Sequence, residues 1–222
     1  MKNFAAAFFD LDGTLVDNYT AIWRTFEESF LKFGFAPPTL EEVRRSVGGS
    51  VLMTAKKLLP GVPDSDVQRL CEYYMLANPK HVFDGLAELP GAAALLRALK
   101  ARGVRIACFT NKHVEAADAV LERLGLARFM ERVCATTLNS PRKPDRDFGM
   151  AALKSMGVSA GESLFVGDSP YDWKSAENVG AACALVATGS DSEESLRASC
   201  PSAVGVYGDL AGLGRAVFGV EI

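Results

Sequence analysis

The feature that most constrains the fold is a series of short apolar runs, each separated from the next by a segment with helical character. The runs cover residues 5–9, 104–109, 132–137, 164–166 and 182–187. Apolar runs of this length are typical of strands buried on both faces of a parallel sheet. One intervening segment begins at Pro90, reaches Ala101 and is closed by Gly103, as a helix would be. Strands that alternate with helices predict an α/β fold built on a parallel sheet.

The interval from residue 16 to residue 85 interrupts this alternation, because it contains helical patterns and no convincing strand. Its first segment carries large apolar residues at helical spacing: Ile22, Phe26, Phe30 and Phe33. Thr39 and Glu42 have the spacing of a capping box and predict the start of another helix. A chain of 222 residues suits one main domain with an insert. We therefore expect a core domain at 1–15 and 86–222 and a helical insert at 16–85.

Composition excludes several classes of partner. The formal net charge is −3, without a basic stripe to attract nucleic acid. No apolar stretch approaches the roughly 20 residues that a membrane span requires. The five cysteines form no CxxC pair and lie mainly in apolar runs, which is typical of small reduced core residues. These features favour a cytoplasmic protein that binds neither nucleic acid nor membrane.

Polar residues cluster at the carboxyl ends of three predicted strands, which is where open α/β sheets bind ligands. Asp10 follows the first run, Thr110-Asn111-Lys112 the second and Gly167-Asp168-Ser169 the fourth. Asp10 and Asp12 are two positions apart, and two acids at that range can serve as nucleophile and proton donor. An isolated Asp-x-Asp more often caps a helix, but that interpretation does not explain the other two clusters. We therefore expect all three clusters to meet at one edge of the sheet.

Four ordered segments resemble the motifs of the haloacid dehalogenase superfamily. They are FFDLDGTLVD, the Thr110-Asn111 pair, Lys143-Pro144 and VGDSPYDWKSAENVGA, and they span nearly the whole chain. The resemblance implies a Rossmann-like core with the first strand at the centre of the sheet. It also implies a helical cap domain inserted after that strand, where the helical interval lies.

The resemblance also implies the roles of individual residues. Asp10 would be the nucleophile that forms an aspartyl-phosphate, and Asp12 would act as the acid and base. Lys143 would offset charge on the transferring group and keep the nucleophile ionised. The residues expected to bind or wrap the phosphate are Gly13, Thr14, Thr110, Asn111 and Lys143.

Magnesium is the cofactor that the resemblance implies. Its ligands would be the Asp10 carboxylate, the Asp12 backbone carbonyl and the Asp168 carboxylate, with Asp172 supporting them from behind. His81 and His113 have no ligand partner at useful spacing and are interpreted as surface or hinge residues.

The cap is expected to choose the substrate. The stretch RRSVGGSVLMTAKKLLPG resembles the cap loop of phosphoglycolate phosphatases and their pyrophosphatase relatives. Arg45, Gly48 and Gly49 are its candidate substrate-binding residues, and an arginine there could grip a substrate carboxylate. A surface ion pair is an equally good interpretation of Arg45. Lys56 or Lys57 could form a Schiff base, as phosphonate-cleaving members do, although adjacent helical lysines are usually solvated.

The function predicted is hydrolysis of a small phosphomonoester, with 2-phosphoglycolate favoured. A pyrophosphatase, a sugar-phosphate phosphatase or a mutase like β-phosphoglucomutase would share the scaffold. A non-catalytic binding protein would be expected to lack the nucleophile or a metal carboxylate, and Asp10, Asp12, Lys143 and Asp168 are all present. Aspartate at position 12 disfavours dehalogenation, since the dehalogenating members lack a carboxylate there. The sequence leaves monomer and homodimer open.

Overall fold

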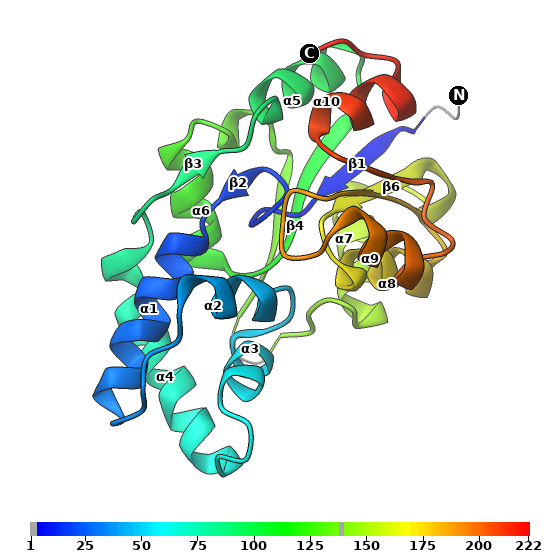
Figure 1. Ribbon diagram of the computed structural model, residues 1–222. Coiled ribbons are helices and arrows are strands. Elements are labelled where there is room, and N and C mark those ends of the chain that lie inside the picture. Colours follow the sequence, from blue (N-terminus) through cyan, green and yellow to red (C-terminus); the bar gives the residue numbers. More distant parts are fainter. Residues whose placement is uncertain (1–3, 138–139) are drawn as a thin grey trace.

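A computed structural model describes residues 4–137 and 140–222 of the chain, so residues 1–3 and 138–139 of the predicted core domain lie outside the description. Its main sheet has six parallel strands in the order β5-β4-β1-β6-β7-β8. The strands are β1 (Ala6–Phe9), β4 (Arg105–His113), β5 (Arg132–Thr136), β6 (Ser163–Gly167), β7 (Ala182–Val186) and β8 (Gly205–Tyr207). The predicted α/β fold, with the first strand inside the sheet, is confirmed (Figure 1).

Alternate residues of β1 feed two different hydrophobic clusters, which explains why its run is entirely apolar. Ala7 and Phe9 pack on the side covered by α5 (Ala92–Ala101), α6 (Val114–Arg123) and α10 (Leu210–Leu213). Ala6 and Phe8 pack on the side covered by α7 (Arg146–Met156), α8 (Pro170–Val179) and α9 (Glu193–Ser199). A strand buried on both faces has no position for a polar side chain until it leaves the core. Directly after β1 that position is Asp10.

Four helices lie between the first strand and the rest of the core and pack as a body of their own (Figure 1). They are α1 (Tyr19–Lys32), α2 (Leu40–Ser46), α3 (Val51–Leu58) and α4 (Asp64–His81). Ile22, Phe26 and Phe30 of the predicted stripe are buried on α1, whereas Phe33 follows the helix and is only partly buried. The Phe26 ring lies 4.6 Å from the Tyr74 ring of α4. Thr39 and Glu42 form the expected capping box at the start of α2. We call these four helices the cap.

The chain passes between core and cap through two short strands. β2 (Val16–Asp17) and β3 (Ala87–Glu88) pair antiparallel, outside the main sheet. The sequence does not reveal β2, because two residues carry no periodicity. Another difference is that β4 continues to His113, with an irregularity after Phe109. The residues Thr110-Asn111-Lys112 therefore lie in the last part of the strand rather than after it.

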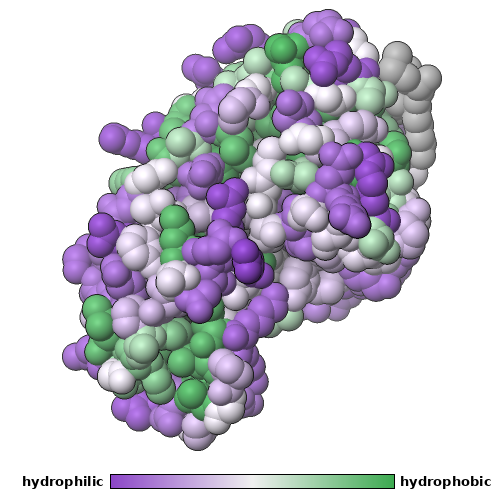
Figure 2. Space-filling view, viewed as in Figure 1, coloured by the Kyte–Doolittle hydropathy of each residue, from purple (hydrophilic) through white to green (hydrophobic). Residues whose placement is uncertain are grey.

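Surface hydropathy differs between core and cap (Figure 2). Hydrophilic residues cover most of the core on the face shown, whereas apolar residues gather at the lower end of the cap. Five of the exposed large apolar side chains belong to cap helices: Leu31, Leu40, Leu52, Met53 and Leu76. None of the helices in the described ranges is both long enough and apolar enough to cross a bilayer.

Candidate active site

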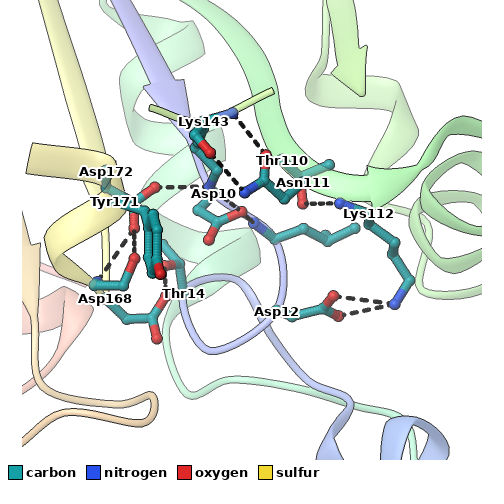
Figure 3. A network of polar contacts seen from close by, with 12 residues as sticks. Asp10, Asp12, Thr14, Thr110, Asn111, Lys112, Lys143, Asp168, Tyr171 and Asp172 are labelled. Atoms are coloured by element: carbon teal, nitrogen blue, oxygen red, sulfur yellow. Dashed lines mark hydrogen bonds and ion pairs between the residues drawn. The ribbon is translucent and has the colours of Figure 1, made fainter. Parts of the chain in front are cut away.

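The polar residues predicted to meet do so at the carboxyl end of the central strands (Figure 3). Asp10 follows β1, Asp168 follows β6, and Lys143 lies in the loop before α7. The Lys143 Nζ atom is 2.9 Å from Asp10 Oδ1 and 2.7 Å from Asp172 Oδ1. Asp10, Asp168 and Asp172 each bring a carboxylate oxygen within 4.8 Å of the others. One buried lysine and three buried carboxylates therefore form a single cluster.

Glycine allows the chain to turn sharply after β1. Gly13 has φ +84°, and a Cβ atom there would lie 2.6 Å from both Asp168 Oδ2 and the Tyr19 hydroxyl. The backbone N–H of Gly13 donates to the Val16 carbonyl oxygen at 2.8 Å, which closes the turn. Thr14, fully buried, donates its hydroxyl to Asp168 Oδ1 at 3.2 Å. Both residues were predicted to wrap the phosphate, and the structure places both against Asp168.

Asn111 holds the loop that carries Lys143. Its side-chain Oδ1 accepts from the Lys143 backbone N–H at 2.7 Å, and its Nδ2 donates to the Lys143 carbonyl oxygen at 3.2 Å. The amide of Asn111 is thus used to position Lys143, although the residue also lines the cavity described below. Thr110, 2% exposed, lies beside it and accepts from the Lys112 backbone N–H.

Burial sets the protonation of the cluster. Desolvation raises the pKa of Asp10 to about 6; the negative charge of Asp172 adds to this and Lys143 opposes it. Desolvation also raises the pKa of Asp168, and the charges of Asp10 and Asp172 raise it further. Burial alone would lower the pKa of Lys143, but its two carboxylate partners raise it above the ordinary value. Burial and mutual repulsion therefore favour the protonated forms of Asp10 and Asp168 even with Lys143 beside them.

The donor set fits Mg²⁺. Oδ2 of Asp10 and Oδ2 of Asp168 make no hydrogen bond or ion pair to the residues that the structure describes, so both remain available as hard oxygen ligands. Asp172 is different, because Oδ1 contacts Lys143 and Oδ2 accepts from the backbone N–H and the hydroxyl of Ser169. Both of its oxygens are engaged by the protein, which suits support rather than direct ligation.

Asp12 faces a different partner, Lys112, which belongs to the predicted polar cluster after the second apolar run and for which no role of its own was predicted. The Lys112 Nζ atom is 3.0 Å from Asp12 Oδ2 and 3.2 Å from Oδ1 (Figure 3). Only 7% of the Lys112 side chain and 14% of the Asp12 side chain are exposed. The position of Lys112 directly after Asn111 was the only signal that could have identified it.

A cavity of about 580 Å³ opens between this edge of the sheet and the cap. Asp10, Asp12, Thr110 and Asp168 line it from the core. From the cap it is lined mainly by apolar and small residues, among them Ile22, Phe26, Gly48, Gly49, Val51, Leu52 and Met75. The two candidate glycines of the cap loop are therefore at the cavity.

Arg45 does not line the cavity. Its guanidinium pairs with Glu41 at 2.8 Å, and 74% of the side chain is exposed. The neighbouring Arg44 reaches the core instead: its guanidinium lies 4.7 Å from the Tyr19 ring centre and donates to the Thr188 carbonyl oxygen at 3.4 Å. This arrangement matches the surface ion-pair interpretation of Arg45.

The lysines of α3 also face away from the cavity. Lys56 pairs with Asp64 at 2.8 Å, and Lys57 donates to the Ser46 carbonyl oxygen. Neither lines the cavity, so the geometry gives no support for a Schiff base.

The two histidines differ from each other. His113, predicted to be a surface or hinge residue, lines the cavity at the end of β4. His81 ends α4 beside the return to the core, with Nε2 2.8 Å from Glu28 and Nδ1 2.8 Å from Asp84.

Comparison with known proteins agrees with this geometry. The family model described as "Haloacid dehalogenase-like hydrolase" matches residues 7–186. A phosphoglycolate phosphatase of Rhodospirillum rubrum is 35% identical over 94% of this chain and 89% of its own length. A Clostridium perfringens protein with a provisional pyrophosphatase name is 27% identical over 79% of this chain and 80% of its own length. A solved structure from Clostridium acetobutylicum shares the fold, with a TM-score of 0.89 at 22% identity over 99% of this chain and 100% of that one.

The chain therefore belongs to the haloacid dehalogenase-like hydrolase family. It is an enzyme of that family, a phosphoric monoester hydrolase. The predictions of family and enzyme class are confirmed, and the non-catalytic alternative is set aside.

Proposed function

We propose that the enzyme is a Mg²⁺-dependent phosphatase that hydrolyses a small phosphomonoester, with 2-phosphoglycolate the favoured substrate, through an aspartyl-phosphate on Asp10. The observation that carries the proposal is the contact of Asp10 with Lys143, with Asp168 close by and Asp12 across the same cavity. Support for the substrate comes from the phosphoglycolate phosphatase relatives, at 30–35% identity in the more similar cases.

Two displacements at phosphorus would complete the reaction. In the first, a carboxylate oxygen of Asp10 attacks the phosphorus, the bond to the ester oxygen breaks, and Asp12 gives a proton to the departing alcohol. In the second, water attacks the phosphorus of the aspartyl-phosphate, Asp12 takes a proton from that water, and the bond to Asp10 breaks to release orthophosphate. Asp12 lines the cavity and pairs with Lys112 rather than with the Lys143 cluster, which supports its assignment to both proton transfers.

The chain's own groups would handle the charge. Asp172 and the two hydrogen bonds from the Asn111 side chain hold Lys143, whose ammonium contacts Asp10. The ammonium can also stabilise the negative charge of the phosphoryl group during its transfer. Asp10, the Asp12 carbonyl and Asp168 would hold Mg²⁺. When bound, Mg²⁺ shields the carboxylate nucleophile from the negatively charged phosphoryl group. The cap covers the cavity and limits the access of water.

The test is release of orthophosphate from 2-phosphoglycolate with and without Mg²⁺, comparing the wild type with Asp10→Asn. We expect activity that requires Mg²⁺ and is abolished in the variant, which keeps the shape of Asp10 but removes its nucleophilic oxygen. Turnover that survives in Asp10→Asn would exclude the covalent route. Trapping of a phosphorylated peptide that contains Asp10 would support it directly.

Pyrophosphatase activity is the second candidate, because a relative carries that name. A panel of pyrophosphate, sugar phosphates and 2-phosphoglycolate, measured as kcat/KM for orthophosphate release, separates these substrates. A mutase would instead convert a sugar phosphate into its isomer without net release of orthophosphate.

A further inference from the structure

The ammonium of Lys112 has hydrogen-bonding capacity that Asp12 does not use. An ammonium carries three N–H donors, and the two oxygens of Asp12 take at most two of them. No third acceptor for Lys112 Nζ is found among residues 4–137 and 140–222. At least one donor is thus left over on a side chain that is only 7% exposed.

That spare donor belongs to a cavity-lining residue. Lys112 lines the cavity together with Asp12, on the core side and opposite the cap. In Figure 3 the Lys112 side chain extends toward Asp12, away from the cluster formed by Lys143 and Asp10. A substrate whose phosphorus is at Asp10 and whose ester oxygen is at Asp12 would therefore place its next atoms near Lys112.

The cap offers no competing cation. Among the described residues that line the cavity, those from the cap include neither lysine nor arginine, and the cap's one charged side chain there is Glu72. On the core side the other residues that can carry positive charge are His113 and Arg142. Arg142 lies in the loop that leads to Lys143, where its guanidinium donates to the Ser140 carbonyl oxygen.

We propose that Lys112 selects phosphomonoesters of 2-hydroxy acids by binding the carboxylate of the substrate. In such esters the carboxyl carbon is attached to the carbon that carries the ester oxygen. That short separation allows Asp12 to reach the ester oxygen while Lys112, 3.0 Å from Asp12 Oδ2, reaches the carboxylate. The inference deepens the proposed function and rests on it, because it assumes phosphoryl transfer at Asp10.

The experiment compares two substrates of equal length, 2-phosphoglycolate and 2-hydroxyethyl phosphate, which has an alcohol where the first has a carboxylate. The quantity measured is the ratio of their kcat/KM values in the Mg²⁺-loaded enzyme. Lys112→Met removes the charge but keeps the length of the side chain. Because a hydrogen bond to a charged group is lost, we expect this variant to lower the ratio by about 10- to 100-fold. The change should come mainly from a higher KM for 2-phosphoglycolate.

Three further variants serve as controls. Lys112→Arg keeps the charge and is expected to retain most of the preference. Lys174→Met removes a lysine from a surface pair with Glu177 and is expected to leave the ratio unchanged. Arg142→Met tests the competing cation and is also expected to leave the ratio unchanged.

The possible results are distinct. If Lys112→Met slows both substrates equally, or leaves the ratio unchanged, Lys112 merely positions Asp12 and the inference is overturned. A ratio that falls only in Arg142→Met overturns it as well. If the wild type shows no preference for 2-phosphoglycolate, both the proposed substrate and the inference are wrong. Mg²⁺-dependent turnover of 2-hydroxyethyl phosphate would in that case still support the phosphatase reaction.

Discussion

Among the residues that the structure describes, Lys143 is the only cation that contacts both Asp10 and Asp172, so the consequences of Lys143→Met can be worked out from the site. The side chain is 1% exposed and pairs at 2.9 and 2.7 Å. Breaking a buried ion pair by removing one partner costs about 3–5 kcal/mol, because the other charge is left buried without compensation. For a protein of this size about 1 kcal/mol lowers Tm by roughly 2–4 °C. We therefore expect Tm to fall by about 6–20 °C at pH 8.

The fall in the Tm of Lys143→Met should depend on pH, and the titration of Asp10 sets the direction of this dependence. Its pKa is raised from 3.8 to about 6 in the folded protein, so folding favours the protonated form. Its contribution to stability is complete below pH 3.8 and is lost as pH rises through about 6, a difference of about 3 kcal/mol. Lys143 lowers the pKa of Asp10, so removal of Lys143 raises that pKa further. In the variant, the stability that protonated Asp10 contributes is therefore still being lost at higher pH. The variant should therefore be closest to the wild type near pH 5.

The assay is thermal unfolding of metal-free protein at pH 5 and pH 8, with Lys174→Met as the matched control. Lys174 is 48% exposed, and its pair with Glu177 should contribute under about 1 kcal/mol. The reasoning is refuted if Lys143→Met melts within about 2 °C of the control at pH 8, or if its deficit in Tm is the same at both pH values. Turnover at neutral pH should also fall, since a larger fraction of Asp10 would be protonated.

Three other predictions test separate parts of the site. Mg²⁺ should raise the Tm of the wild type more at pH 8 than at pH 5, because the carboxylates that would bind it are ionised at the higher pH. Asp168→Ala should abolish this increase in Tm, and an unchanged increase would place the ion elsewhere. Asp12→Ala should lower kcat by about 10²- to 10⁴-fold, and a wild-type kcat would mean that another group moves the proton. Arg44→Ala should raise KM by loosening the contact between the cap and Thr188, whereas the paired control Arg45→Ala should leave KM unchanged. Equal effects of the two substitutions would contradict the assignment of Arg44 as the residue that joins the cap to the core.

Much of the core could be predicted because most of its strands are buried on both faces. The five apolar runs correspond to β1, β4, β5, β6 and β7. Continuous apolar sequence suits the buried strands β1, β6 and β7 and the first part of β4, whereas β5 lies at the edge of the sheet and is only partly buried. The two-residue β2 was missed because it is too short for any pattern. The end of β4 was misjudged because the polar triplet Thr110-Asn111-Lys112 looks like a loop, while the backbone continues as an irregular strand to His113.

Side-chain direction was the part that the sequence did not contain. Arg44 and Arg45 are adjacent and chemically identical, and which of them reaches the core depends on how the cap sits over the sheet. The same limit applies to Lys112, whose partner Asp12 is 100 positions away. A motif identifies which residues converge on an edge, but the contact of each one depends on the angle at which its strand or helix arrives.

The surroundings of Asp172 explain how three acids in one cluster can have different roles. Backbone and hydroxyl donors from Ser169 hold Oδ2 of Asp172, and Lys143 holds Oδ1, so this carboxylate is fully engaged before any ligand arrives. Gly167 makes that fit possible, because a Cβ atom there would lie 2.0 Å from the Asp172 carboxyl carbon. Asp10 and Asp168 each keep one oxygen without a partner among the described residues. Three acids of similar burial therefore differ in their readiness to bind a cation, and the difference comes from the donors around each acid rather than from the acid itself.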